Sequence, residues 1–301
     1  MLAPIGMSVY MRLNHIHRTV EALKKNALAS KSILHIFSDA PREGDEAAVA
    51  EVRKYINKID GFAKVNITER ETNSRVYNNR MGMRSLLDNY GKLIWMEEDI
   101  VTAPGFLEYM NSALEYYTDE DRVISITGYT PPISLPQDYV NDVFFLQRFN
   151  AWGFGSWKKK FDRIEDKIDP QDYRNKMRNR EFHRKLVRNG PDIPRLIDRD
   201  VAGIIDALDL KIMYQQVLHD WYTVYPRQSL VQNIGHDGSG VHCRDLNMFH
   251  HDNLWAKVAD FRYQKFSYPD ERIVSENMKF RQLSSLGTVL EKFRHIRRCL
   301  A

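Results

Sequence analysis

Residues 93–99 read LIWMEED, four apolar residues followed directly by three carboxylates. A short, continuous apolar run of this kind is typical of a strand that is buried on both faces of a sheet. The carboxylates come where this strand ends, and three adjacent negative charges repel one another unless a cation lies among them. The stretch therefore predicts a buried strand with a divalent-cation site at its end, and a solvated acidic loop is the alternative interpretation.

Three further apolar runs precede this strand, and a helical pattern separates each run from the next. The runs cover residues 5–10, 33–37 and 64–70. Helices with apolar stripes are predicted after the first and second runs, and a helix over residues 75–90 is predicted after the third. Strands and helices that alternate in this way predict an α/β fold whose central sheet is mostly parallel and is covered by helices on both faces.

Polar side chains follow the ends of all four runs. They are Arg12, Asp39, Arg70 with Asn73, and residues 97–99. Ligands of open α/β sheets bind beyond the carboxyl ends of the strands. Four successive strands therefore deliver polar groups to one edge of the sheet, which is where we expect the functional site.

Composition limits the classes of protein to consider. The chain has 301 residues, is 43% hydrophobic and carries a net charge of only +4, without the strong basic bias of a nucleic-acid-binding domain. Its two cysteines, Cys243 and Cys299, provide neither a disulfide framework nor a four-cysteine zinc site, and indicate a reducing compartment. No run of about 18 apolar residues and no signal-peptide pattern is present. These features predict a cytoplasmic protein.

Residues 95–129, WMEEDIVTAPGFLEYMNSALEYYTDEDRVISITGY, resemble the acidic-motif region of GT-A glycosyltransferases. They are especially similar to the N-acetylglucosaminyltransferase I family and to related bacterial family-2-like sugar transferases. The similarity extends over roughly residues 4–255. It implies the GT-A nucleotide-diphospho-sugar transferase fold and an inverting hexosyltransferase. Such an enzyme moves a sugar from a nucleotide diphosphate, with UDP favoured, to a glycan or a lipid-linked glycan acceptor.

The resemblance also implies roles for individual residues. Asp99, the last acid of the triplet, meets Mn²⁺ or Mg²⁺, and Glu98 stands where the family usually has aspartate. Residues 144–161, FFLQRFNAWGFGSWKKKF, are similar to the segment that lines the sugar and acceptor pocket. The full set of donor-binding residues that the resemblance implies is Arg12 beside the phosphates, Asp39 on the uracil ring, Glu97, Glu98, Trp152 and Gly153.

An inverting transferase needs one carboxylate to remove the proton of the acceptor hydroxyl. The family places this base at the start of a helix, and Asp209 has that position here, although Leu208 replaces the expected tryptophan. Asp206 lies about one turn earlier and is the alternative base. The alternative to a catalytic role is that Asp209 only caps the start of this helix.

The C-terminal part carries two further hypotheses. Residues 229–243, SLVQNIGHDGSGVHC, resemble the closing segment of the same bacterial families, and His242 is a candidate contact for the metal. We divide the chain into a GT-A domain over residues 1–260 and an extension over 261–301. Residues 286–301 carry a basic amphipathic pattern, which predicts either peripheral contact with the inner face of a membrane or docking on the chain's own domain.

Two other functions remain open at this point. A sugar-nucleotide nucleotidyltransferase uses a similar sheet, but it opens with a glycine-rich phosphate loop, and residues 11–14 contain no glycine. A catalytically inactive nucleotide- or carbohydrate-binding protein is the second alternative, because Glu98 and Leu208 depart from the family pattern.

Overall fold

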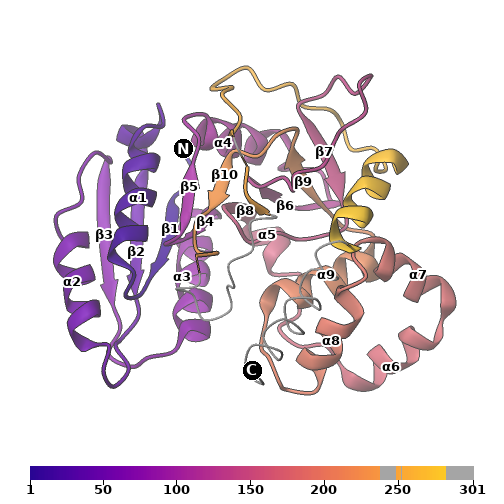
Figure 1. Ribbon diagram of the computed structural model, residues 1–301, viewed down its shortest axis with the longest axis horizontal. Coiled ribbons are helices and arrows are strands. Elements are labelled where there is room, and N and C mark those ends of the chain that lie inside the picture. Colours follow the sequence, from indigo (N-terminus) through magenta and orange to yellow (C-terminus); the bar gives the residue numbers. More distant parts are fainter. Residues whose placement is uncertain (238–248, 252, 283–301) are drawn as a thin grey trace, which may run out of the picture.

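The computed structural model describes residues 1–237, 249–251 and 253–282 of the chain. Its first half alternates strands and helices in the order predicted from the sequence (Figure 1). The elements are β1 (Ile5–Val9), α1 (Leu13–Lys24), β2 (Ile33–Ser38), α2 (Glu46–Ile56), β3 (Lys64–Glu69), α3 (Arg75–Tyr90) and β4 (Lys92–Glu97). A 3-10 turn, η1 (Ala29–Lys31), leads into β2.

The second half completes the sheet and adds helices. Its strands are β5 (Ile100–Thr102), β6 (Val123–Thr127), β7 (Val143–Leu146), β8 (Phe154–Trp157), β9 (Tyr222–Pro226) and β10 (Val231–Asn233). Its helices are α4 (Phe106–Tyr116), α5 (Lys158–Phe161), α6 (Pro170–Arg178), α7 (Arg180–Arg188), α8 (Ile193–Val201) and α9 (Leu208–His219), and residues 271–282 are also helical.

Eight strands form one sheet in the order β3-β2-β1-β4-β8-β6-β9-β7, with β3 and β7 at opposite edges (Figure 1). Four of the seven neighbouring pairs are parallel, and β8 runs antiparallel to both of its neighbours, β4 and β6. Outside this sheet, β5 and β10 pair as a short antiparallel ribbon directly after β4. This ribbon brings the chain around residue 233 back to the end of β4.

Both faces of the sheet are covered, as the side chains of β4 show. Ile94 and Met96 belong to a core cluster with α1, α2 and α4, whereas Leu93 and Trp95 belong to a second cluster with α3, α8 and α9. Successive side chains of a strand point to opposite faces, so an uninterrupted apolar run is what a doubly covered strand requires.

The predicted fold class is confirmed: the chain is an α/β protein with a mostly parallel central sheet and helices on both faces. The arrangement agrees with the GT-A fold that the resemblance implies. Among the residues that the structure describes, no helix has the length and apolar character needed to cross a bilayer.

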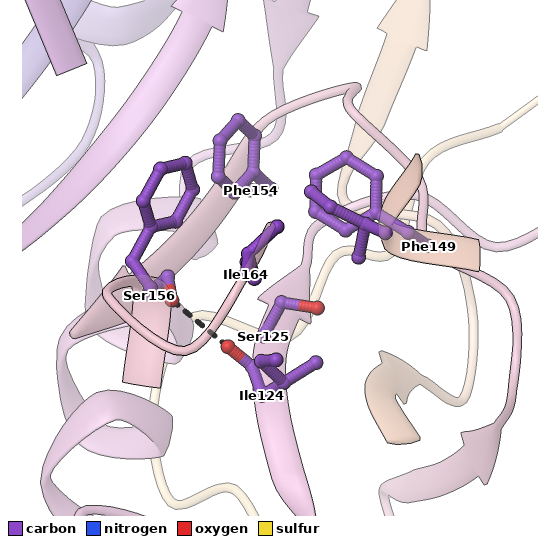
Figure 2. Close-up of a pocket in the computed structure, with 8 residues that line it drawn as sticks. Ile124, Ser125, Phe149, Phe154, Ser156 and Ile164 are labelled. Carbon is purple, nitrogen blue, oxygen red and sulfur yellow. Dashed lines mark hydrogen bonds between the residues drawn. The ribbon is translucent and has the colours of Figure 1, made fainter. Parts of the chain in front are cut away.

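The interior beside β6 and β8 is filled rather than hollow. Figure 2 shows Phe149, Phe154 and Ile164 converging on this region, where the Ser156 hydroxyl donates a hydrogen bond of 2.8 Å to the Ile124 carbonyl. The space that remains has no room for a water molecule. This region is therefore core and not a ligand site.

Two glycines let helix α3 approach the sheet closely. Added Cβ atoms at Gly6 and Gly82 would lie 2.5 Å and 2.6 Å from atoms of the Trp95 ring. The ring is 2% exposed and stacks on Phe37 with 5.6 Å between the ring centroids. It therefore fills the space that both glycines leave.

We predict that Gly82→Ala destabilises the protein. Helix propensity alone favours alanine over glycine by about 1 kcal/mol. Overpacking against Trp95 costs about 1–3 kcal/mol and outweighs that gain. Urea unfolding of Gly82→Ala and of Ser85→Ala, at an exposed position of the same helix, measures the difference. A stabilised Gly82→Ala would show that the contact with Trp95 does not limit the packing.

Candidate functional site

A pocket of about 640 Å³ opens at the carboxyl ends of β1, β2 and β4. Parallel neighbours end on the same side of a sheet, so the residues after these three strands meet there. The predicted site residues that line the pocket are Arg12, Asp39, Glu97, Glu98, Asp99 and Trp152, joined by Arg42, Asn73, Arg75 and Asn233. Arg70 follows β3 but is not among the lining residues.

Arg12 forms a double ion pair at the centre of the pocket. Its Nε lies 2.6 Å from Glu98 Oε1, and its Nη2 lies 2.7 Å from Asp99 Oδ2. Burial disfavours the charged guanidinium, but the carboxylates of Asp99 and Glu98 outweigh this effect and raise the pKa of Arg12. The backbone N–H of Tyr10 holds the second oxygen of Glu98 at 2.5 Å. Arg12 is therefore a cation that lies between two almost fully buried carboxyl groups.

Several buried polar atoms around this ion pair have no hydrogen-bond partner among the described residues. They are Arg12 Nη1, Asp99 Oδ1 and both ring nitrogens of His236. Burial lowers the pKa of His236, and the nearby charge of Asp99 only partly opposes the shift. Buried polar atoms are almost always hydrogen-bonded, so this cluster indicates the place of a ligand.

A divalent metal ion fits these atoms. Within the described part of the chain, no group of three or more His, Cys, Asp or Glu residues is placed to hold a metal ion. The unpartnered oxygen of Asp99 and a neutral ring nitrogen of His236 nevertheless offer two ligands of types that Mn²⁺ accepts. Mg²⁺ and Mn²⁺ at phosphate sites commonly take only one or two protein ligands, and water and phosphate oxygens fill the remaining positions.

His236 was not singled out from the sequence, and it directly follows Gly235. The predicted metal contact, His242, lies outside the described residues. The backbone N–H of Ile234 donates to the Asp99 carbonyl at 2.9 Å, which ties this segment to the end of β4. A prediction that β10 pairs with β5 would have pointed to His236, because this pairing brings the residues after Asn233 to Asp99.

Asp39 lies at the other end of the pocket and is 4% exposed. Its Oδ1 accepts hydrogen bonds from the backbone N–H groups of Ala40 at 2.9 Å and Ser74 at 3.1 Å. Among the residues that the structure describes, its Oδ2 accepts only a longer bond of 3.4 Å from Asn73. Asp39 therefore braces the start of α3 with one oxygen and presents the other with acceptor capacity to spare.

An aromatic cluster borders the ion pair. The Trp152 ring packs edge-on against Tyr129, His236 and Phe249, with centroid distances of 4.5, 5.4 and 5.8 Å. Gly153 does not line the pocket. Its φ is +63°, and a Cβ there would meet Phe106 in the core at 3.0 Å. The structure thus places Trp152 in the pocket wall and uses Gly153 to turn the chain behind it.

The two candidate bases have different surroundings. Asp206 lies 2.6 Å from the Lys211 ammonium and 3.0 Å from Arg80, and its bond to Lys211 is the main cause that lowers its pKa. Asp209 lies in the first turn of α9, and none of the ion pairs within the described chain includes its carboxyl group. Burial raises the pKa of Asp209, although hydrogen bonds from the backbone N–H groups of Leu210 and of Asp209 itself, and then the charges of Arg148 and Arg75, partly oppose this.

Asp209 belongs to the same electrostatic environment as the acidic triplet. Burial, followed by the charges of Asp99, Asp209 and Glu98, raises the pKa of Glu97 to about 7, and Arg75 opposes the shift. Asp209 does not itself line the pocket. Its charge nevertheless acts on Glu97, which does line the pocket.

Comparisons with known proteins do not assign the chain to a protein family. No family model and no curated protein matches it. S. aureus TarS 1-349 in complex with UDP is similar with a TM-score of 0.42 and 10% identity, over 77% of this chain and 60% of that chain. The same protein with UDP-GlcNAc gives a TM-score of 0.36 and 16% identity, over 56% and 49%.

The mannosyltransferase PcManGT from Pyrobaculum calidifontis, in complex with GDP-Man and Mn²⁺, gives a TM-score of 0.36 and 11% identity, over 54% of this chain and 46% of that chain. The chain therefore spans between 46% and 60% of the length of these three solved structures. All three TM-scores are below 0.5, so the function has to be argued from the site itself.

We predict that Gly235→Ala damages the pocket. A Cβ at this position would lie 2.1 Å from Asp99 Oδ2 and 2.9 Å from Arg12 Nη1, so the added methyl group must displace the ion pair. Calorimetry with UDP and Mn²⁺ should show binding weakened at least about tenfold, which corresponds to about 1.4 kcal/mol.

Gly91→Ala serves as the control for this experiment. Gly91 has a φ of +75° and no atom within 4 Å of the added methyl group, so alanine strains the backbone far from any ligand. We expect it to lower the melting temperature and to leave nucleotide binding unchanged. Equal binding by Gly235→Ala and the parent would contradict the close contact at Asp99.

Proposed function

We propose that this protein is an inverting glycosyltransferase that moves a sugar from a nucleotide-diphosphate donor to a hydroxyl acceptor with the help of Mn²⁺ or Mg²⁺. The observation that carries the proposal is the cluster of Arg12, Asp99 and His236. Arg12 and Asp99 line the pocket, and His236, whose buried ring nitrogens are unpartnered among the described residues, directly follows Gly235, which lies against both of them. A diphosphate with its metal ion supplies the charges that this cluster lacks.

The donor lies along the pocket in this proposal. The nucleoside base occupies the end near Asp39 and Asn73, whose side chains offer an acceptor and a donor for a base edge. Uracil is favoured because the sequence resembles UDP-using transferases. The diphosphate lies near Arg12, and the sugar ring extends toward Trp152, whose partly exposed ring provides a flat apolar surface.

Asp99 and His236 hold the metal ion in this scheme. When bound, the ion stabilises the negative charge that develops on the departing diphosphate. Arg12 adds a fixed positive charge on the same side, where preorganised charges lower the barrier without reorganising during the reaction.

Asp209 is the proposed general base. It accepts the proton of the acceptor hydroxyl while that oxygen forms a bond to the anomeric carbon. The bond from this carbon to the diphosphate oxygen breaks on the opposite face, and its electron pair leaves with the diphosphate. One displacement of this kind inverts the configuration. Asp209 suits the task because no cation neutralises it directly, whereas Asp206 is held by Lys211 and Arg80.

The acceptor is proposed to be a glycan or a lipid-linked glycan. The predicted membrane contact lies in residues 286–301, outside the described residues. This part of the proposal therefore rests on the sequence pattern alone.

Turnover against a panel of nucleotide sugars tests the proposed activity. We expect release of the nucleoside diphosphate with one donor, loss of that release in excess EDTA, and recovery with Mn²⁺. Asp99→Asn removes a metal ligand and should slow the reaction at least about 10²-fold, because charge stabilisation by the metal contributes several kcal/mol. Asp119→Asn, at an exposed position, is the control. Full activity of the protein in EDTA would exclude the metal-assisted mechanism.

Replacement of the two candidate bases distinguishes their roles. We expect Asp209→Asn to bind donor normally and to turn over at least about 10²-fold more slowly, since a general base acts mainly in the transition state. Asp206→Asn should stay within a few-fold of the parent. An active Asp209→Asn beside an inactive Asp206→Asn would reverse the assignment.

The same base predicts the acidic limb of the pH profile. Asp209 must be ionised to accept a proton, and burial raises its pKa above the ordinary value of an aspartate. The kcat should therefore fall, as pH decreases, at a higher pH than an exposed aspartate (pKa about 3.9) would give. A kcat that is independent of pH down to about 4 would argue against this base.

A further inference from the structure

The Nη2 atom of Arg12 lies 2.7 Å from Oδ2 of Asp99, the carboxylate that is proposed to bind the metal ion. We propose that Arg12 blocks metal binding until a nucleoside diphosphate takes over its guanidinium, so that metal and nucleotide bind cooperatively. The inference rests on the proposed function and concerns the regulation of that same site. In this scheme Asp99 changes its cationic partner from Arg12 to the metal ion during loading.

The guanidinium is placed to exchange partners. Two of its three nitrogens hold Glu98 and Asp99, while Nη1 is buried and has no hydrogen-bond partner among the described residues. The side chain is 18% exposed and lines the pocket. A phosphate group in the pocket would give Nη1 a charge-assisted hydrogen bond, and arginine binds phosphate with two parallel bonds where geometry allows.

The metal ion and Arg12 compete for one carboxylate. An ion bound to Asp99 Oδ1 would share this carboxylate with a guanidinium only 2.7 Å from Oδ2. Two cations on one carboxylate repel each other, and burial weakens the screening by water. Metal alone must therefore bind against the charge of Arg12. A diphosphate removes this penalty because its negative charges bind the guanidinium and the metal at the same time.

Contacts with the backbone hold Glu98 and Asp99 in place, so Arg12 is the side chain that can move when a ligand binds. Gly235 packs so closely on the pair that even a methyl group would overlap Asp99 Oδ2. Glu98 is fixed by the Tyr10 N–H through its side chain and by the Thr19 hydroxyl, at 2.8 Å, through its carbonyl. Asp99 and Glu98 are thus held in place, and exchange takes place by movement of the arginine toward the pocket.

Binding measurements on the full chain test the proposal without relying on turnover. The affinity for Mn²⁺ is measured from the EPR signal of free Mn²⁺, with and without saturating UDP, and the affinity for UDP with and without Mn²⁺. By linkage the two ligands strengthen each other by the same factor. We expect the parent protein to bind Mn²⁺ weakly alone and at least about tenfold more tightly with UDP.

Arg12→Gln removes the competing cation. We expect it to bind Mn²⁺ alone at least about tenfold more tightly than the parent and to lose most of the coupling with UDP. Arg12→Lys keeps the charge, but its ammonium group cannot bind both carboxylates as the planar guanidinium does. Its affinity for Mn²⁺ alone should therefore lie between those of the parent and Arg12→Gln. This variant also keeps the test valid if the glutamine variant misfolds. Arg42→Gln removes one charge from the same pocket without touching the triplet, and should change the affinity for Mn²⁺ alone by less than about threefold.

The outcomes separate this inference from the proposed function. If the parent and Arg12→Gln bind Mn²⁺ alone equally, or Arg42→Gln acts like Arg12→Gln, the inference is overturned while a metal-assisted transferase remains. If UDP binds but Mn²⁺ binds to none of the variants, both the exchange and the metal part of the function fail. If neither ligand binds in any combination, the proposed function itself is wrong.

Discussion

Two buried carboxylates after β4 share one guanidinium, and the rest of the pocket depends on this arrangement. Arg12 reaches Glu98 and Asp99 because β1 and β4 are adjacent and parallel, so the residues that follow them leave the sheet at one edge. Buried charges are tolerated only when they are paired, and removal of one partner typically costs about 3–5 kcal/mol. The sheet order is therefore a condition for pairing these buried acids with Arg12, and the short β5–β10 ribbon brings Gly235 against them.

The first half of the fold could be predicted because each element shows its period over many residues. The apolar run before the triplet indicates a strand covered on both faces, and helices α1 and α2, of 12 and 11 residues, show clear apolar stripes. The strands β5, β7, β8 and β10 are only three or four residues long. Such short runs have no measurable period, and β8 contains Gly155 and Ser156, which are not typical strand formers. Their pairing depends on tertiary contacts, which cannot be predicted from the local sequence.

The same division applies to the site. Strand ends can be located from the sequence, so Arg12, Asp39 and the acidic triplet were assigned to one edge, and all of them line the pocket. Their partners could not be assigned this way. The contact between Arg12 and Asp99 depends on side-chain direction, and the position of His236 depends on the pairing of β10 with β5, which lie about 130 residues apart in the chain. Gly235 acts only through the methyl group that it lacks.

The charge balance of the pocket gives an independent reason to expect a second cation. Its lining contributes three cationic side chains, those of Arg12, Arg42 and Arg75, and four acidic ones, those of Asp39, Glu97, Glu98 and Asp99. With a pKa of about 7, Glu97 is only partly ionised near neutral pH, so the lining carries a charge between 0 and −1. A nucleoside diphosphate adds at least two further negative charges. Arg12 cannot neutralise both its carboxylate partners and the diphosphate, and like charges at such distances repel strongly away from bulk water. A divalent ion, as proposed for this site, would restore the balance, and the unpartnered Oδ1 of Asp99 is the atom of the lining that would bind it.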